Sequence, residues 1–153
     1  MANVLATLFN TIQASIGTSF QTNAWTYAPL KEGIDNVSEA LNEVVQQYFF
    51  LSDNGFARNN VTGMAPAITF TGRRVQGDAA QDYIFGNKYK LLTNRASSFQ
   101  LIVTDNSQTP AATQTLVVPC TICNIQEWSG ATTDDSAISF EVRFDGAPQF
   151  TED

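Results

Sequence analysis

The sequence predicts a mainly β protein: an antiparallel β-sandwich or half-barrel with a short helix laid against it. Two observations support this fold class. Several segments in the second half alternate apolar and polar residues, as half-buried antiparallel strands do. One short stretch between them changes to helical spacing. Because no linker composition or internal repeat divides the 153 residues, we expect a single domain over 1–153.

The N-terminal segment has apolar residues at helical intervals. The residues that follow this period are Leu5, Leu8, Phe9, Ile12 and Ile16. Asn3 is a possible N-cap and Gly17 a possible stop, which predicts a helix near residues 4–16.

Residues 34–51 fit both a helix and a strand. A helical face would contain Ile34, Val37, Ala40, Leu41, Val44 and Val45. In contrast, "QQYFFL" at 46–51 leads into the turn "SDNG" as a strand does. Our interpretation combines the two, with a helix over 36–43 followed by a strand over 44–51.

The second half contains the clearest strands. Alternation places the following residues on inward faces: Ile68 and Phe70; Phe99, Leu101 and Val103; and Ile138, Phe140, Val142 and Phe144. The stretch "TQTLVVPCTICNIQEW" is also β-rich, but Pro119 cannot donate to a strand ladder. We therefore expect an edge or a bulge at Pro119.

A short helix is predicted near residues 78–86. In "GDAAQDYIF", Asp78 and Gln81 have the spacing of a capping box. Ala80, Tyr83 and Ile84 recur at helical intervals after this cap.

Composition excludes several function classes. The 15 acidic residues outnumber the 8 basic ones, and a net charge of −7 disfavours binding to nucleic acid. Histidine is absent, which removes the commonest general base and metal ligand. We therefore expect a protein that is not an enzyme and uses no cofactor or metal. There is no membrane-length apolar run and no basic signal-peptide start, so we expect a cytoplasmic site of synthesis and no membrane contact.

Charge is segregated along the chain. Residues 32–53 carry only acids, 58–95 are mostly basic, and 105–153 are mostly acidic. Such blocks are either solvated faces of one domain or complementary surfaces of neighbouring subunits. On the second interpretation the candidate interface residues are Arg73, Arg74, Arg58, Glu39 and Glu43.

The groups that could carry chemistry lack partners. Cys120 and Cys123 form a Cys-x-x-Cys pair within a predicted strand, on opposite faces, with no further His or Cys to complete a zinc site. The carboxylate pairs are Asp134 with Asp135, in a polar turn, and Glu141 with Asp145. We interpret all of these as structural or solubilising residues.

Three segments together resemble a known family. They are "EALNEVVQQYFFLSDNGFARNNVTG", "ITFTGRRVQGDAAQDYIF" and "FEVRFDGAP". In this order they are similar to the tail tube (major tail) proteins of long-tailed bacteriophages that infect Gram-positive hosts. The similarity spans residues 30–149 and is most specific in "TGRRVQGDAAQDYI" and in Asp145, Gly146 and Pro148.

The resemblance implies a structural virion protein without catalytic or cofactor residues. Its copies would assemble in the host cytoplasm into hexameric rings that stack into the hollow tail tube. DNA would pass through the lumen without specific binding, and an acidic wall would repel it. Partners would be other copies and the tape measure, terminator and distal tail proteins. An extended arm, from residues 1–30 or 52–66, would join one ring to the next.

Two other functions stay open at this stage. The tube of a phage-derived injection or bacteriocin particle is a close variant. A β-sandwich binding module, for example for carbohydrate, is a different class, in which Trp25, Tyr27 and Trp128 would form an aromatic platform.

Overall fold

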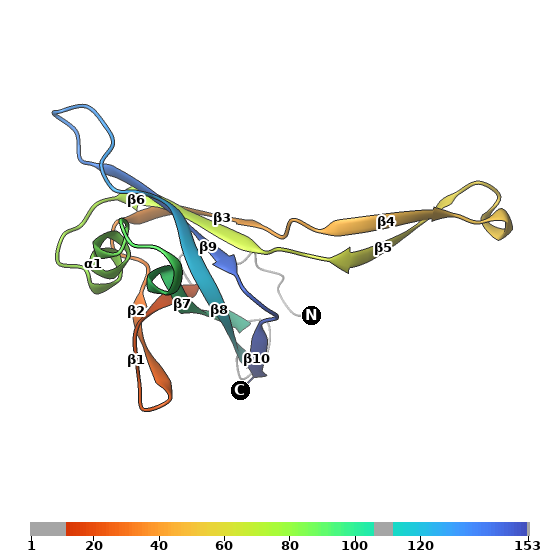
Figure 1. Ribbon diagram of the computed structural model, residues 1–153, viewed down its shortest axis with the longest axis horizontal. Helices are drawn as coiled ribbons and strands as arrows, with labels where there is room; N and C mark the ends of the chain where they lie inside the picture. The colour runs from red at the N-terminus through yellow and green to blue at the C-terminus, as the bar shows by residue number, and fades with distance from the viewer. Residues whose placement is uncertain (1–11, 106–111, 153) are drawn as a thin grey trace, which may run out of the picture.

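Strands dominate the computed structural model, which describes residues 12–105 and 112–152 (Figure 1). One antiparallel sheet has eight strands, seven of them in the order β2-β1-β7-β8-β9-β6-β3, and β10 lies beside β8. Their bounds are β1 (Gln13–Gln21), β2 (Ala24–Pro29), β3 (Ile34–Ala40), β6 (Ala67–Arg73), β7 (Ala96–Asp105), β8 (Ala112–Gln126), β9 (Ala137–Phe144) and β10 (Gln149–Glu152). The mainly β fold class predicted from sequence is confirmed.

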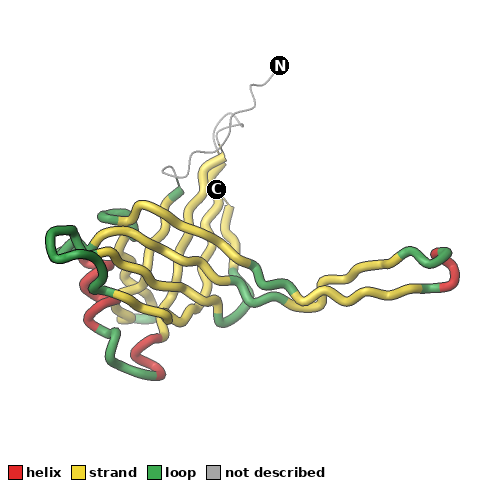
Figure 2. The backbone as a smooth tube through the Cα atoms, turned by 90° about the horizontal axis from the view of Figure 1, so that it is seen from above, coloured by secondary structure: helices red, strands yellow, loops and turns green. Residues whose placement is uncertain are grey.

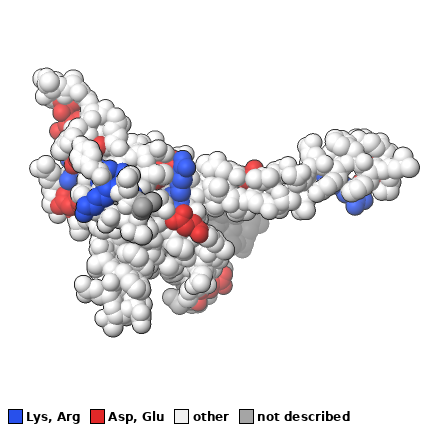
Figure 3. All heavy atoms as spheres, in the orientation of Figure 1, with Lys and Arg blue, Asp and Glu red and all other residues white. Residues whose placement is uncertain are grey.

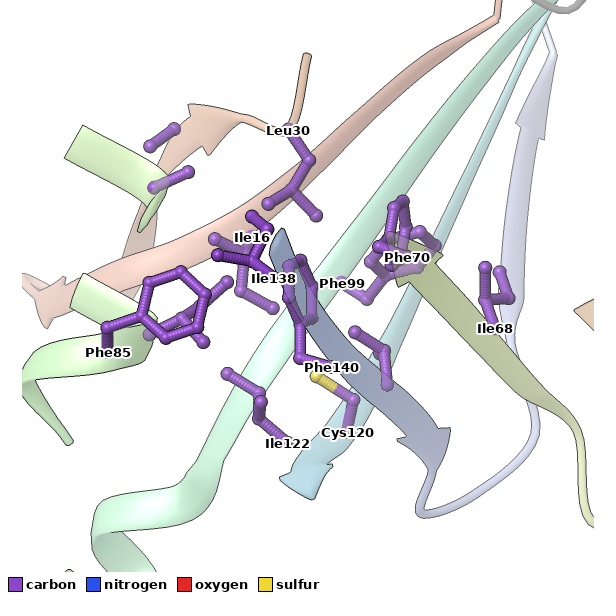
Figure 4. Close-up of a cluster of buried hydrophobic side chains, with 14 of the residues drawn as sticks. Ile16, Leu30, Ile68, Phe70, Phe85, Phe99, Cys120, Ile122, Ile138 and Phe140 are labelled. Atoms are coloured by element: carbon purple, nitrogen blue, oxygen red, sulfur yellow. The ribbon is translucent and has the colours of Figure 1, made fainter. Parts of the chain in front are cut away.

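The sheet curls so that strands far apart in its order pack together. Phe70 on β6 lies 6.2 Å from Phe99 on β7 between ring centroids, although β8 and β9 separate the two strands in the sheet. Phe140 on β9 stacks on Phe70 at 5.1 Å. All three rings are at most 1% exposed. Aromatic side chains from several strands therefore fill one core inside a half-barrel (Figure 4).

Helix α1 (Ala79–Gly86) closes one side of this core. Its N-cap is Asp78, whose side chain accepts a hydrogen bond from the backbone nitrogen of Gln81 at 3.1 Å. Phe85 packs edge-on against Phe140 at 6.2 Å. The helix predicted near 78–86 is confirmed, with its start where the capping residues placed it.

Two predicted helices are corrected. Residues 36–43 do not form a helix, because Ile34–Ala40 is strand β3 and pairs with β6. Ile34 and Val37 of β3 both pack against the core although they are three residues apart. A β-bulge between Ile34 and Asn36 adds one residue to the strand and so puts both side chains on the same face. The strand predicted over 44–51 is present as β4 (Val44–Phe49).

The helix predicted near 4–16 is wrong where the structure describes it. Gln13–Gln21 is strand β1, in which Ala14 and Ile16 face the core and pair with β7. Ile12 and Ile16 are four residues apart, which fits both a helical and a strand period, so their spacing could not distinguish the two. Residues 4–11 lie outside the described residues.

Pro119 lies in the interior of β8 with no register shift against β7, so it marks no bulge, but one side of β8 has no paired strand at this residue, which agrees with the predicted edge. On one side Ser98 of β7 pairs with it. On the other side β10 pairs with β8 up to Val117 and β9 begins at Cys120. Proline is tolerated here because β8 changes partners at this residue, so no neighbour needs its missing N–H.

The two-stranded sheet formed by β4 and β5 (Ala57–Gly63) extends away from the body as an arm (Figures 1 and 2). Its strands continue β3 and β6 through two short linkers. Asn42, in the left-handed conformation at φ 50°, donates its side-chain amide to the Ala65 carbonyl at 2.9 Å. This bond joins the two linkers where the arm leaves the body.

Candidate interaction surfaces

The arm, residues 44–63, exposes large apolar side chains along its whole length. The exposed fractions are Val44 51%, Val45 48%, Tyr48 43%, Phe49 66%, Phe50 48%, Leu51 97%, Phe56 77% and Val61 48%. Figure 3 shows that the visible side of the arm is almost free of charge. A contiguous exposed apolar surface of this kind indicates a site for protein contact.

Both faces of the arm carry these residues. Val44, Gln46 and Tyr48 alternate with Val45, Gln47 and Phe49 along β4. Opposite them, β5 supplies Asn60 to the first face and Asn59 to the second. Each face therefore has an apolar root, an amide centre and an aromatic end.

The tip of the arm is held by interactions within the subunit. Arg58 pairs with Asp53 at 2.6 Å and lies 5.7 Å from the Phe50 ring centroid. Tyr48 stacks on Phe50 with centroids 5.7 Å apart. The short 3-10 helix η2 (Leu51–Asp53) turns the chain here. Arg58, a predicted interface residue, is 63% exposed in its side chain and fixes the shape of the tip.

Arg74, another predicted interface residue, lies inside the subunit. Its side chain is 9% exposed, and it donates to Glu127 at 2.7 Å and to Asp82 at 2.9 Å. Lys88 also donates to Glu127. Burial opposes ionisation of Glu127, but the bonds from Lys88 and Arg74 outweigh it and hold the pKa of Glu127 below its ordinary value. This cluster joins α1 to the ends of β6 and β8.

The other predicted interface residues are on the surface. Arg73 is exposed, whereas its neighbour Arg74 points inward, so the two arginines lie on opposite sides of the strand end. Arg73 donates to the Asp135 carbonyl at 3.1 Å in the loop between β8 and β9. Glu39 and Glu43 are exposed at the root of the arm. Glu39 and Glu43 therefore lie near the root of the arm and Arg58 near its tip, so the structure does not bring these residues together or into the Arg74 cluster.

The two cysteines are free and lie on opposite faces of β8. Cys120 is buried in the core, and burial together with the charge of Asp145 raises the pKa of its thiol to about 12. Cys123 is half-buried on the other face, and burial raises the pKa of its thiol too. Neither thiol is activated for nucleophilic or redox chemistry.

The carboxylates also lack an acid-base arrangement. Glu141 accepts hydrogen bonds from Arg143 and Asn124, which hold the pKa of its carboxyl below the ordinary value. Asp134 and Asp135 are exposed in the β8–β9 loop. Over residues 12–105 and 112–152, no group of three or more acidic or cysteine side chains is placed to hold a metal ion. Within those ranges no helix has the length and apolar character needed to span a membrane.

The aromatic residues considered as a platform are engaged in different places. Trp25 on β2 lies 5.3 Å from the Phe20 ring, and the Tyr27 hydroxyl is hydrogen-bonded to Ser98 at 2.9 Å. Trp128, 58% exposed, lies over Lys88 beside the helix. A groove of about 920 Å³ between the β1 and β3 sides is lined mainly by apolar residues, with exposed Lys31, Glu32 and Glu39 among them.

Sequence reasoning named 52–66 as a candidate arm but missed the exposed apolar residues at 44–51, because a large apolar residue is by default assigned to the core. One signal was present. The segment "ARNNVTG" pairs with "VVQQYF" but offers almost no apolar residues of its own. A hairpin whose second strand has so few apolar residues offers little apolar surface to pack on a core, which favours exposure of the hairpin.

Solved structures with a similar fold come from the tails and tubes of phage-like particles. The tail of an empty GTA (gene transfer agent) particle, determined with C6 symmetry, matches with a TM-score of 0.69 and 16% identity over 95% of this chain and 99% of the other. The SPP1 tail tube matches with a TM-score of 0.66 and 13% identity, over 95% of this chain and 79% of the SPP1 chain. A chain of the sheath-tube complex of the contractile injection system PVC matches with a TM-score of 0.57 and 14% identity, over 94% of this chain and 90% of the other.

No protein-family model matches the sequence, and no curated protein matches it. At these identities the structural matches show a shared fold. The described chain therefore has the fold of subunits found in phage-like tails and tubes, over nearly its whole length.

Proposed function

We propose that this chain is a non-catalytic structural subunit that assembles with other copies of itself into a tube of a phage-like particle. The arm is the observation that carries the proposal. A free subunit with eight large apolar side chains exposed on one projecting hairpin has a strong drive to bury them against another protein. The fold shared with tail and tube subunits supports a second copy as that protein.

The sheet supplies a second type of contact. Strands β2 and β3 end the main sheet order, and β10 lies beside β8 with its Phe150 58% exposed. Edge strands that stay unpaired are aggregation hazards in a monomer, whereas a ring of subunits covers them. We propose rings of six copies, for which the C6 symmetry of the GTA tail is the support, with the arm joining one ring to the next.

The finer proposal is a phage tail tube, located in the virion tail and assembled in the host cytoplasm, that conducts DNA into the host. The segment "TGRRVQGDAAQDYI" and the acidic balance of the chain support it. Tape measure, terminator and distal tail proteins would then meet the tube. The tube of an injection system is the alternative, and it shares the same fold.

Negative-stain electron microscopy of the purified full-length protein tests the proposal. We expect rings or tubes of uniform width, which become more abundant as the protein concentration rises. A strictly monomeric protein at all concentrations, whose tryptophan fluorescence changes on addition of sugars, would instead support the binding module.

A further inference from the structure

The turn between β4 and β5, at the far end of the arm, contains the dipeptide Asn54-Gly55 (Figure 2). Asn-Gly occurs once in the chain. Asn54 follows η2 in the left-handed conformation at φ 54°, Gly55 continues the turn at φ 88°, and both residues are exposed. No described atom lies within 4 Å of the position that a Cβ on Gly55 would take. The backbone nitrogen after Asn54 is therefore open to approach from the Asn54 side chain.

An asparagine in this setting loses ammonia without an enzyme. The Gly55 backbone nitrogen gives up its proton to solvent and attacks the side-chain carbonyl carbon of Asn54. The new C–N bond closes a five-membered succinimide ring, and the side-chain nitrogen takes up a proton and leaves as ammonia. Water then opens the ring at the side-chain carbonyl, which gives aspartate, or at the backbone carbonyl, which gives isoaspartate. No electrons are transferred, and water is the only reagent consumed.

Gly55 favours ring closure at this position. Closure needs rotation about the Asn54 Cα–C bond from its ψ of 35°, and glycine adds neither a side chain that blocks the approach nor a restriction of its own φ. The Gly55 nitrogen donates no hydrogen bond to any residue that the structure describes, whereas Asn54 donates to Leu51 at 3.3 Å and Phe56 to Asp53 at 3.0 Å. The attacking nitrogen is therefore not held by a protein acceptor.

The three other described asparagines in the left-handed conformation lack this combination. Asn42 and Asn124 each donate the side-chain amide to a hydrogen bond at 2.9 Å, which fixes the group that would react. Asn23 is exposed in the β1–β2 turn, but the residue that follows it, Ala24, carries a side chain. Asn54 has exposure, a following glycine and no side-chain hydrogen bond to a described residue.

Either product changes the contact surface of the arm tip. Leu51, 97% exposed, and Phe56, 77% exposed, flank the site. Aspartate would add a carboxylate between them, next to Asp53, whose partner Arg58 is already engaged. Burial of such an unpaired charge against apolar side chains is unfavourable. Isoaspartate would instead route the backbone through the side-chain carbon and so change the path of the turn. A modified tip should be excluded from a contact that buries it.

We propose that Asn54-Gly55 is a self-modification site that limits the lifetime of free subunits: Asn54 deamidates while the arm is exposed, and assembly protects it. This proposal rests on the proposed function, in which the arm is buried against another copy. Burial of Leu51 and Phe56 in that contact restricts rotation of the turn and limits the access of water. Subunits that stay unassembled therefore lose their competence with time, whereas assembled subunits keep it.

Peptide mapping by mass spectrometry tests the modification itself. The full-length protein is aged at mildly alkaline pH, at a concentration below that at which tubes form. We expect Asn54 to convert to aspartate and isoaspartate several-fold faster than Asn23, which is the matched internal control because it is also exposed and left-handed. Conversion of Asn54 no faster than that of Asn23 would overturn the proposal.

Assembly of a partly aged sample tests the consequence. Tubes are formed by raising the protein concentration and are separated from free subunits by sedimentation. Chains with intact Asn54 should be enriched in the pellet and modified chains in the supernatant. On further ageing, Asn54 should convert several-fold more slowly in tubes than in free subunits. Equal modified fractions in pellet and supernatant, or equal rates in tubes and free subunits, would overturn the proposal.

Asn54→Gly provides the matched variant, because it removes the reacting amide and suits a φ of 54°. Relative to its own freshly purified sample, its tube yield should stay constant on ageing. The yield of the unsubstituted chain should fall in proportion to the modified fraction, and a parallel decline of both proteins would overturn the proposal. Absence of tubes even from freshly purified, unsubstituted protein would contradict the proposed function instead, since the mapping of free subunits does not depend on tubes.

Discussion

Arg74 and Glu127 form an ion pair at 2.7 Å in which each side chain is only 9% exposed. The pair connects the end of β6 to the end of β8, and Lys88 and Asp82 extend it to the helix segment. Removing one member of such a pair leaves the other charge with little solvent and an incomplete set of partners.

Glu127→Gln should destabilise the subunit at neutral pH by about 2 kcal/mol, because hydrogen bonds to charged groups are lost. The lowered pKa of Glu127 means that its stabilisation is complete above its ordinary value of 4.5 and is lost as the pH falls through the folded-state value. Urea unfolding of both proteins from pH 7 to pH 3 checks this. The difference in unfolding free energy between the two proteins should narrow below pH 4.5. A difference that widens in acid would contradict a stabilising role of ionised Glu127.

Charge reversal should act differently at the two neighbouring arginines. Arg74→Glu should lower the unfolding free energy by about 3 kcal/mol or more, because it places a second carboxylate beside Glu127 and Asp82. Arg73→Glu should change it by less than about 0.5 kcal/mol, since the side chain is exposed. If the basic block contacts a neighbouring subunit, Arg73→Glu should nevertheless reduce the yield of tubes in electron microscopy. An unchanged yield would exclude Arg73 from the interface.

Gly72→Ala should destabilise the fold by about 2 kcal/mol or more. A Cβ at Gly72 on β6 would lie 2.0 Å from the Gly33 carbonyl oxygen, and backbone cannot move aside as a side-chain end can. Gly63→Ala on the arm is the matched control, because nothing lies within 4 Å of a Cβ there. Thermal unfolding of both variants provides the measurement. Equal melting temperatures would mean that β3 and β6 separate easily.

The arm should need both of its faces for assembly. Tyr48→Ser alters the first face and Phe49→Ser the second, and each residue is exposed in the free subunit. Neither substitution should lower the melting temperature of the free subunit, because the arm lies outside the core (Figure 2). We expect each to raise the protein concentration needed for tubes, measured by sedimentation. If only one variant had this effect, the arm would lie against its neighbour on a single face.

The sequence was sufficient where local chemistry and packing agree. Asp78 marked the start of α1 because its carboxylate satisfies a helix N–H group, which is a local interaction. Phe140 and Val142 marked β9 because their strand is half-buried, so its two faces differ in polarity.

The sequence was not sufficient where pairing at a distance decides the structure. Strand β3 is an edge strand with two residues against the core, and only its pairing with β6 shows that it is not a helix. Alternation predicted that Arg73 and Arg74 point to opposite sides, but Glu127, the partner of Arg74 53 residues away, was not predictable. The sequence offered 52–66 as one candidate for an extended arm, but the exposure of the apolar residues at 44–51 was not predictable, because it depends on where the hairpin points.

That exposure has a consequence for the temperature dependence of assembly. Burial of apolar side chains is driven mainly by entropy near 25 °C and weakens on cooling. An assembly held by Leu51, Phe56 and the other apolar residues of the arm should therefore bind less tightly in the cold. Chilled subunits would stay dispersed, and warming alone would start their polymerisation without any ligand or cofactor.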